Sequence, residues 1–316
     1  FRIAANAELT PKLWRAALNG RARGIDFRTT SPARIIPRGG SYELLPTRID
    51  FGQGNIRLAG TYGNGIKLQS RLDRLDLSLV NAFVPGLGVS GKATGSLDFA
   101  QASSTAFPRA DARLSINGFT RTTAASVSQP IDINFVGKLL ADGGEARAVM
   151  RRGGTVIGRL VTSLRPLSAG SGSWVTRVLE APLSGGIRYN GPADTLFSFA
   201  GQADQRLSGP IGVAADFSGR VSQPQLSGII RANSLTYENQ TYGTRLSNMA
   251  IQGRFSGDRL ELQQLRATAG DGTVEAQGSV SLASNSGYPM DVRVTLDDAR
   301  LARSDALSAT ATGNLR

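Results

Sequence analysis

Apolar and polar residues alternate strictly over several stretches of the chain. In one of them, Val274, Ala276 and Val280 alternate with Glu275 and Gln277. Because successive side chains of a β-strand point to opposite faces, such a stretch has one apolar and one polar face. The pattern predicts half-buried strands. It recurs over residues 56–62, 213–221, 226–232, 274–282 and 292–297.

Glycine-rich segments separate the predicted strands. Glycine next to asparagine, aspartate or serine favours the tight turns of β-hairpins. Such combinations occur at Gly63–Gly65, Asp142–Gly144, Ser256–Asp258 and Asp271–Gly272. We therefore expect consecutive strands to be joined as antiparallel hairpins.

A few short stretches break the alternation, and we interpret them as helical turns. They are Thr10–Gly20, Leu77–Phe83, Trp174–Glu180 and Arg303–Leu307. In the first of them, Thr10 is a good N-cap, Pro11 suits the first helical position and Gly20 can end the helix. We expect Trp14 and Trp174 to be packing anchors of these helices.

Three blocks of sequence recur in the same order, which indicates an internal repeat. The pairs are 54–60 with 272–278, 72–77 with 296–301, and 93–97 with 311–315. The first and last pairs share one offset, and an insertion near Ser284–Pro289 explains the larger offset of the middle pair. Only Ser168–Ser173 reads as a flexible stretch. The sequence thus predicts one elongated array of strands rather than separate globules.

Composition excludes several kinds of chemistry. The 316 residues include no cysteine and no histidine, which removes the usual zinc ligands, disulfides and histidine general bases. The net charge is +12, but the arginines are dispersed and no aromatic platform accompanies them, so nucleic acid binding is disfavoured. No apolar run is long enough to span a bilayer. We expect a non-enzymatic protein without metal or cofactor.

The tightest acidic groups are Asp73 with Asp76 and Asp297 with Asp298. Three residues apart in a strand, Asp73 and Asp76 are expected to point to opposite faces, whereas a glycosidase needs two carboxylates that face one another. Their position before the expected helix at Leu77–Phe83 favours a turn or capping role.

The apolar strand rows are the feature with functional content. They form either a sealed core or an open groove, and an open apolar surface marks a binding site for something apolar. The candidate lining residues are Val213, Phe217, Leu226, Ile230, Ile251, Phe255, Val274, Val280, Leu282, Val292, Val294 and Leu296.

Several motifs of the second half of the chain resemble a known family. They are Ser222–Gly228, Tyr242–Leu246, Ala267–Thr273, Leu296–Leu301 and Gly313–Leu315. In these motifs the chain resembles the C-terminal region of the TamB family of AsmA-like, bridge-like lipid transfer proteins. TamB is the inner-membrane subunit of the translocation and assembly module. The resemblance is strong over residues 208–316 and looser over 1–207.

The resemblance implies an all-β fold, in which an elongated, folded-over sheet (a β-taco) with a few short helices encloses an apolar groove. Residues 1–207 would be a repetitive groove segment. Residues 208–316 would begin the TamB C-terminal-type domain and continue the same groove. Because Asn314–Arg316 falls within an expected strand, we expect the chain to be a segment of a longer one.

The resemblance also implies a function. The groove would carry phospholipid acyl chains between the inner and outer membranes, in the periplasm, on a protein anchored by an N-terminal helix outside this segment. The partner would be TamA, a BamA-type protein of the outer membrane, bound partly through other regions. The alternative is a scaffold or chaperone that receives outer-membrane β-barrel and autotransporter strands at exposed sheet edges. A sealed-core adhesin solenoid is a further alternative.

Overall fold

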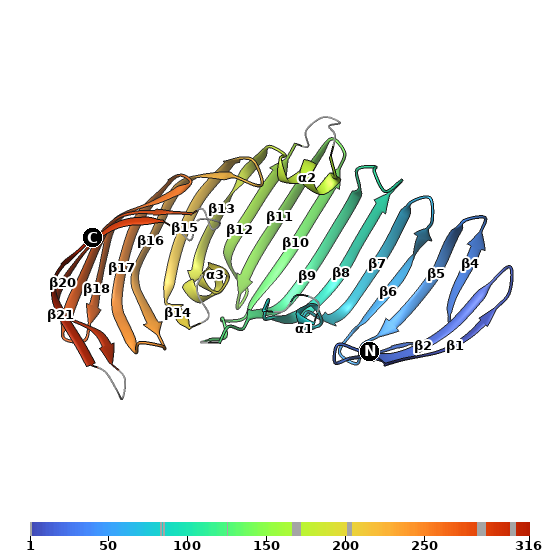
Figure 1. Cartoon of the computed structure of the whole chain (residues 1–316), viewed down its shortest axis with the longest axis horizontal. Helices are drawn as coiled ribbons and strands as arrows, with labels where there is room; N and C mark the ends of the chain where they lie inside the picture. Colours follow the sequence, from blue (N-terminus) through green and yellow to red (C-terminus); the bar gives the residue numbers. More distant parts are fainter. Residues whose placement is uncertain are drawn as a thin grey trace. The chain divides into compact units, whose positions relative to one another are not determined.

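A computed structural model describes residues 2–82, 84, 86–124, 126–165, 172–200, 204–282, 289–303 and 308–316. The described residues form 21 strands of one sheet and three short helices (Figure 1). The prediction of an all-β fold with a few short helices is confirmed. The strand pairs with a described register are all antiparallel, and most join neighbours in the sequence.

The first eleven strands are β1 (Arg2–Leu9), β2 (Trp14–Ala22), β3 (Ile25–Thr29), β4 (Ala33–Arg38), β5 (Ser41–Asp50), β6 (Asn55–Tyr62), β7 (Ile66–Asp76), β8 (Val89–Gln101), β9 (Arg109–Arg121), β10 (Ile131–Leu140) and β11 (Gly143–Arg152). The others are β12 (Thr155–Leu164), β13 (Leu183–Pro192), β14 (Gln205–Ser208), β15 (Pro210–Gly219), β16 (Pro224–Asn239), β17 (Thr244–Gly257), β18 (Arg259–Ala269), β19 (Gly272–Ser281), β20 (Met290–Arg303) and β21 (Ser308–Leu315). The helices are α1 (Ser78–Asn81), α2 (Trp174–Leu179) and α3 (Ala193–Ala200).

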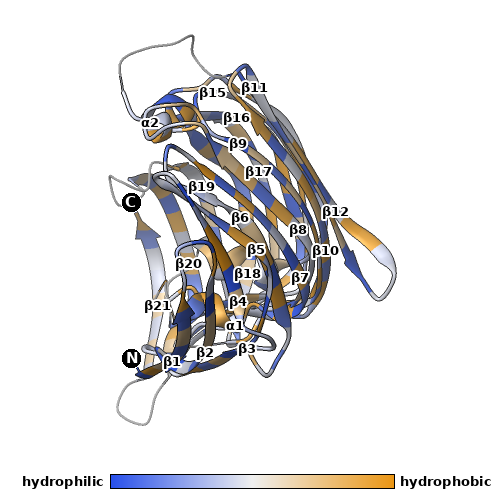
Figure 2. Cartoon of the chain, turned by 90° about the vertical axis from the view of Figure 1, so that its right-hand side faces the viewer, coloured by the Kyte–Doolittle hydropathy of each residue, from blue (hydrophilic) through white to orange (hydrophobic). Residues whose placement is uncertain are grey.

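The alternation seen in the sequence gives each strand two different faces. Hydrophobic and hydrophilic segments alternate along the strands in Figure 2. In β19, for example, Val274 is buried while Thr273 and Glu275 are exposed. The predicted turns at Gly63–Gly65 and Asp271–Gly272 connect β6 to β7 and β18 to β19. The turns predicted at the other two positions also connect consecutive strands.

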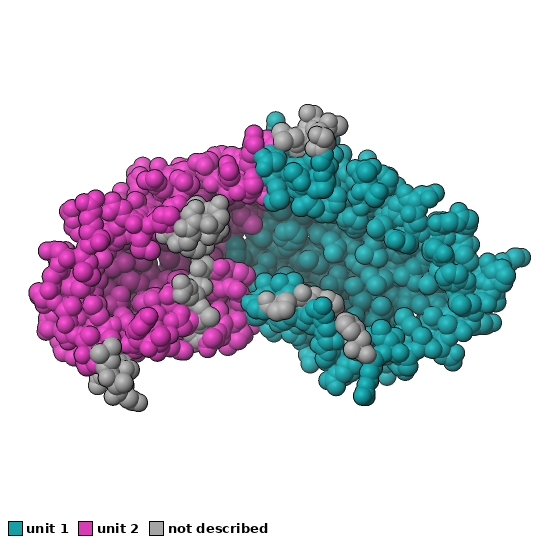
Figure 3. Space-filling view, in the orientation of Figure 1, with its two compact units in different colours: residues 1–119, 130–153, 163–181 teal, residues 120–129, 154–162, 182–316 magenta. Residues whose placement is uncertain are grey.

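The chain divides into two compact units (Figure 3). Unit 1 comprises residues 1–119, 130–153 and 163–181, and unit 2 comprises residues 120–129, 154–162 and 182–316. This division concerns compactness, so the distinction between a segment 1–207 and a domain 208–316 stays a prediction.

The predicted internal repeat is present in the strand register. Strands β6–β8 of unit 1 correspond to β19–β21 of unit 2. In β7, Leu72 pairs with Gly95, and in β20 Leu296 pairs with Gly313. The pairing of both strands shifts directly after these leucines. A shift of this kind is a β-bulge, which bends a strand and increases its twist.

The same backbone conformation closes both bulges. Arg74 and Asp298 each have a φ angle of 46°, in the left-handed region that few residues other than glycine adopt. Their backbone N–H groups donate to the hydroxyls of Thr94 and Thr312, at 3.1 and 3.0 Å. Because sequence motif, register and hydrogen bond all recur, the repeat is structural.

The predicted helix over Thr10–Gly20 is wrong, because this stretch is the hairpin between β1 and β2. The Thr10 hydroxyl accepts from the Leu13 N–H at 3.0 Å and donates to the Leu13 carbonyl at 2.8 Å. It therefore closes a turn instead of capping a helix. Trp14 begins β2 and packs its ring 5.2 Å from that of Tyr42, as expected of a packing anchor.

The other helix predictions have different outcomes. Helices α1 and α2 confirm the predictions over Leu77–Phe83 and Trp174–Glu180, in shorter form. Residues 304–307 of the fourth predicted helix, the predicted insertion before Pro289 and most of Ser168–Ser173 lie outside the described residues. Helix α3 was not predicted.

Two equivalent glycines test the repeat. A methyl group on Gly54 would overlap the carbonyl oxygen of Arg74, and one on Gly272 would overlap that of Asp298. We expect Gly54→Ala and Gly272→Ala each to lower the free energy of unfolding by about 1–3 kcal/mol, measured by urea denaturation. In Gly212→Ala the new methyl meets only ordinary contact, 3.7 Å from the nearest backbone oxygen. A change in Gly272→Ala no larger than in this control would contradict the repeat geometry.

Candidate functional site

Strand register aligns the apolar residues of unit 2 into rows that cross consecutive strands. One row contains Tyr189, Val213, Ile230, Gly253, Leu262, Gly278 and Val292. A second contains Ile187, Ala215, Gly228, Phe255, Leu260, Val280 and Met290. A third contains Ala232, Ile251, Leu265, Ala276, Val294 and Leu315. Cross-strand partners have Cβ atoms about 5 Å apart, so the rows form one continuous apolar face.

Most of the predicted lining residues belong to this face. The three rows contain Val213, Ile230, Val292, Phe255, Val280, Ile251 and Val294. Phe217 and Leu226 pair with each other at the end of β15. Leu282 follows the end of β19, where its N–H donates to the carbonyl of Asp258 at 2.7 Å.

Two predicted lining residues lie in a small closed core instead. Val274 and Leu296 pair with each other and are 6% and 5% exposed. They pack with Ala269 and Ala299, which are fully buried. Because both side chains are buried in this cluster, neither is accessible from the apolar face.

The rest of the apolar face is covered unevenly, since Tyr189, Ala215 and Ala232 are buried. Val213, Ile230, Phe255 and Val294 are each intermediate in exposure, whereas facing sheets of a sandwich bury such residues in a shared core. The chain exposes 18539 Å². Two separate compact globules, each of half its 33.3 kDa, would together expose about 15,200 Å². The chain therefore exposes more surface than two such globules would.

Unit 1 has a comparable face of its own. Tyr42 pairs with Tyr62, which pairs with Ile66, and Leu68 and Leu97 lie on the same side of β7 and β8. These five side chains are between 37% and 65% exposed. A contiguous group of exposed apolar side chains is unusual on a soluble surface and marks a contact site for apolar groups. The surface of each unit is visibly hollowed in Figure 3.

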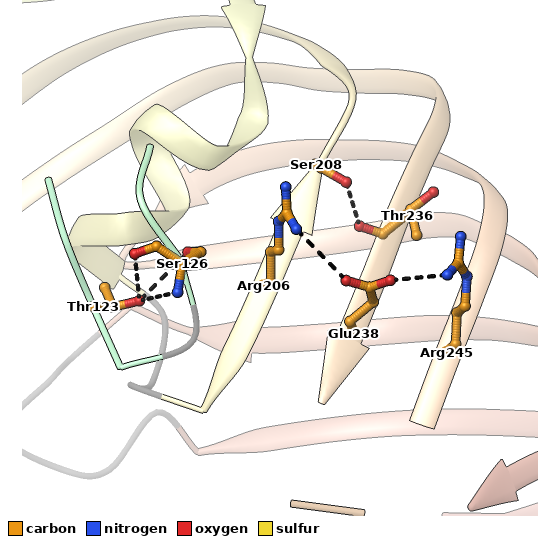
Figure 4. Close-up of polar contacts among 7 residues, drawn as sticks. All are labelled: Thr123, Ser126, Arg206, Ser208, Thr236, Glu238 and Arg245. Atoms are coloured by element: carbon orange, nitrogen blue, oxygen red, sulfur yellow. Dashed lines mark hydrogen bonds and ion pairs between the residues drawn. The ribbon is translucent and has the colours of Figure 1, made fainter. Parts of the chain in front are cut away.

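In unit 2 the face opposite the apolar rows is polar, and several of its charges neutralise one another. Glu238 of β16 lies between Arg206 of β14 and Arg245 of β17, at 4.0 and 3.2 Å (Figure 4). Nearby, the hydroxyl of Ser208 donates to the carbonyl oxygen of Thr236. These are structural cross-strand contacts of the kind that stabilise sheets.

The carboxylates singled out in the sequence are structural as well, although one prediction about them is wrong. The bulge after Leu72 adds a residue, so Asp73 and Asp76 lie on the same face of β7 instead of opposite faces. Each has its own partner, because Asp73 accepts from Asn55 at 3.1 Å and Asp76 accepts from Lys92 at 2.7 Å.

Asp76 also confirms the predicted role at the start of α1. Its second carboxylate oxygen accepts from the Ser78 N–H at 2.8 Å. Burial by itself raises the pKa of Asp76, but the hydrogen bonds from Lys92 and Ser78 outweigh it, so the pKa lies below its usual value of 3.8. The group is thus a carboxylate at neutral pH, which suits a cap and not a general acid.

No group of His, Cys, Asp and Glu in the described residues is arranged to hold a metal ion. Within that same part of the chain, no helix has the length and apolar character needed to cross a membrane. The chain matches no protein-family model, no curated protein and no solved structure.

The Asp76 contacts make a prediction about pH. Because the folded-state pKa is lowered, the stabilisation is present above about pH 4 and is lost as the pH falls through the folded pKa. Asp76→Asn should lower the free energy of unfolding at pH 7 by about 1–2 kcal/mol. The difference from the parent should shrink below pH 4, followed by urea denaturation across pH 3–7. Asp98→Asn, at an exposed position of β8, is the control. A pH-independent difference at Asp76 would refute the charged contact.

Proposed function

We propose that the apolar faces hold the acyl chains of phospholipids, in a non-enzymatic protein that carries lipid between two membranes. The observation that carries the proposal is that the apolar rows are continuous in register across β13 and β15–β20. Val213, Ile230, Phe255 and Val294 of these rows are partly exposed. Each methylene that such a face removes from water contributes about 0.8 kcal/mol. This attraction needs no specific contact, so a chain can slide from one row to the next.

Small residues interleaved in the rows support the proposal. Gly253 and Gly278 separate larger side chains in the first row, and Ala215 and Gly228 do so in the second. A side chain at these positions would narrow the hollow that an acyl chain needs. The same faces would line a groove if the sheet folds over it, as the resemblance to the TamB family implies.

The cellular setting of the proposal rests on that resemblance alone. It comprises a periplasmic location, an anchor in the inner membrane, TamA as the outer-membrane partner and a role in outer-membrane biogenesis.

A second candidate function is a scaffold for β-barrel strands. All eight residues of β1 are exposed, including Ile3 and Leu9. An exposed strand edge can accept an added strand through backbone hydrogen bonds. This function depends on the backbone of the edge, whereas lipid transport depends on the side chains of the apolar face.

Lipid bound to the purified protein separates the two functions. We expect mass spectrometry of an organic extract to find phospholipid on the parent protein. Ile230→Asp combined with Val294→Asp should retain at most a tenth of it, because each carboxylate would lie among acyl methylenes.

A matched control places the same charges on the other face. Gln252→Asp combined with Thr295→Asp adds two carboxylates at exposed positions of β17 and β20 and should retain parental lipid. Circular dichroism would establish that all variants are folded. A folded parent without lipid, or equal loss in both double variants, would refute the lipid proposal. Binding of unfolded barrel strands by a lipid-free parent would then support the scaffold.

A further inference from the structure

A second feature of unit 2 lies on the polar face, opposite the apolar rows. It is a depression of about 740 Å³ lined by residues of β12, β13, β15 and β16. On β15 its lining includes Gly212 and Ala214, which alternate with the apolar-face residues Ile211 and Val213. The lining also includes Tyr189 and Ile211, but both are buried. The exposed lining residues include Arg188, Asn190 and Arg231, which lie on the polar face, so the depression opens there.

The depression arises where small residues lie between long ones. Gly212 pairs with Asn190 on one side and Arg231 on the other. Ala214 pairs in the same way with Arg188 and Ile229. Two positions with almost no side chain are thus flanked by longer side chains on both neighbouring strands. The floor of the depression is the backbone of β15.

The lining of the depression is strongly cationic. Arg159, Arg188 and Arg231 contribute to it, and no acidic side chain among the described residues does. Arg188 pairs with Asp216 at 2.7 Å, outside the lining. The side chains of Arg159 and Arg231 make no hydrogen bond or ion pair with the described residues. Their guanidinium donors are therefore free for a ligand.

The remaining lining residues narrow the chemistry of that ligand. The side chains of Asn190, Asn233 and Ser234 offer hydrogen bonds to neutral polar groups. Val156 and Ile229 are 38% and 37% exposed at the depression. A suitable ligand combines an oxyanion with hydroxyl groups and a small apolar part.

We propose that this depression binds a phosphate ester that carries hydroxyl groups, of the kind found in a glycerophosphate lipid headgroup. Arg159 and Arg231 would hold the phosphate, because guanidinium groups match phosphate oxygens in paired hydrogen bonds. The asparagine and serine side chains would bind the hydroxyls. Arg159 and Arg231 lie at exposed positions of the polar face, so binding of the phosphate does not depend on the proposed acyl-chain rows.

Titration with glycerol 3-phosphate, followed by ligand-observed NMR, tests the site on the whole chain. We expect saturable binding that weakens as salt is added, because both guanidiniums are exposed to solvent. Arg159→Gln combined with Arg231→Gln should weaken binding at least tenfold. Arg293→Gln, at an exposed position of β20 that does not line the depression, should leave it unchanged.

A second variant separates the shape of the site from its charge. Ala214→Leu keeps all three arginines and fills the floor, so it should also weaken binding at least tenfold. Equal weakening by Arg293→Gln would reveal a general charge effect and overturn the site. Undiminished binding of glycerol 3-phosphate by Ala214→Leu would also overturn it. Inorganic phosphate that binds as tightly as glycerol 3-phosphate would overturn the assignment of an ester.

Vesicles identify the source of the headgroup. Phosphatidylglycerol vesicles should bind the parent protein better than phosphatidylcholine vesicles and compete with glycerol 3-phosphate. Stronger competition by polyglutamate than by these vesicles would indicate an acidic protein partner and overturn the proposal. Lipid retained in organic extracts should be the same for parent and Arg159/Arg231 variants. The failure of either site can therefore be told from the failure of the other.

Discussion

Backbone pairing between antiparallel strands is the interaction on which the structure depends. Several residues of the apolar face are only partly buried, so hydrophobic burial at these positions is weaker than in the core of a sandwich. The ladder hydrogen bonds, and the side-chain pairs that they bring opposite one another, must therefore hold the strands together. A sheet of this kind tolerates half-exposed residues such as Ile230 and Phe255 because its stability does not require their complete burial.

Burial differs between the two equivalent bulges. The bulges at Arg74 and Asp298 interrupt the pairing of equivalent strands at equivalent places. Beside the second of them, Val274, Leu296 and Ala299 reach the burial of an ordinary core. Beside the first, Leu72 is only partly buried. The repeated backbone geometry therefore fixes the register, whereas burial depends on what packs against each bulge.

Much of the fold could be predicted from the sequence, because period-two alternation and hairpin glycines are local signals. The repeat was visible for the same reason. The helix at Thr10 was mispredicted because threonine followed by proline suits both a helix N-terminus and a tight turn. Pairing of β2 with β1 decided between them, although Trp14, Ala16 and Leu18 already alternate as in a strand.

Features that depend on several strands could not be predicted. The bulge after Leu72 places Asp73 and Asp76 on one face, because it adds a residue that strict alternation does not allow for. Alternation predicts that a strand has an apolar face but not how far it is covered, so the partial exposure of Ile230 could be found only in the structure. The arginine-lined depression is also hidden in the sequence. It exists only because register sets Gly212 and Ala214 between long side chains of both neighbouring strands.

Ile229 and Ile230 show how closely two environments lie together in this sheet. They are adjacent in β16 and chemically identical, yet one borders the cationic depression and the other belongs to an apolar row. A register slip of one residue would exchange them, and it would do so for every strand beyond. A sheet whose two faces differ in this way therefore needs a register that cannot slip. Bulges that require a left-handed residue, and glycines whose neighbours leave no room for a methyl group, allow only one alignment. The same backbone devices that bend the sheet keep its two faces distinct.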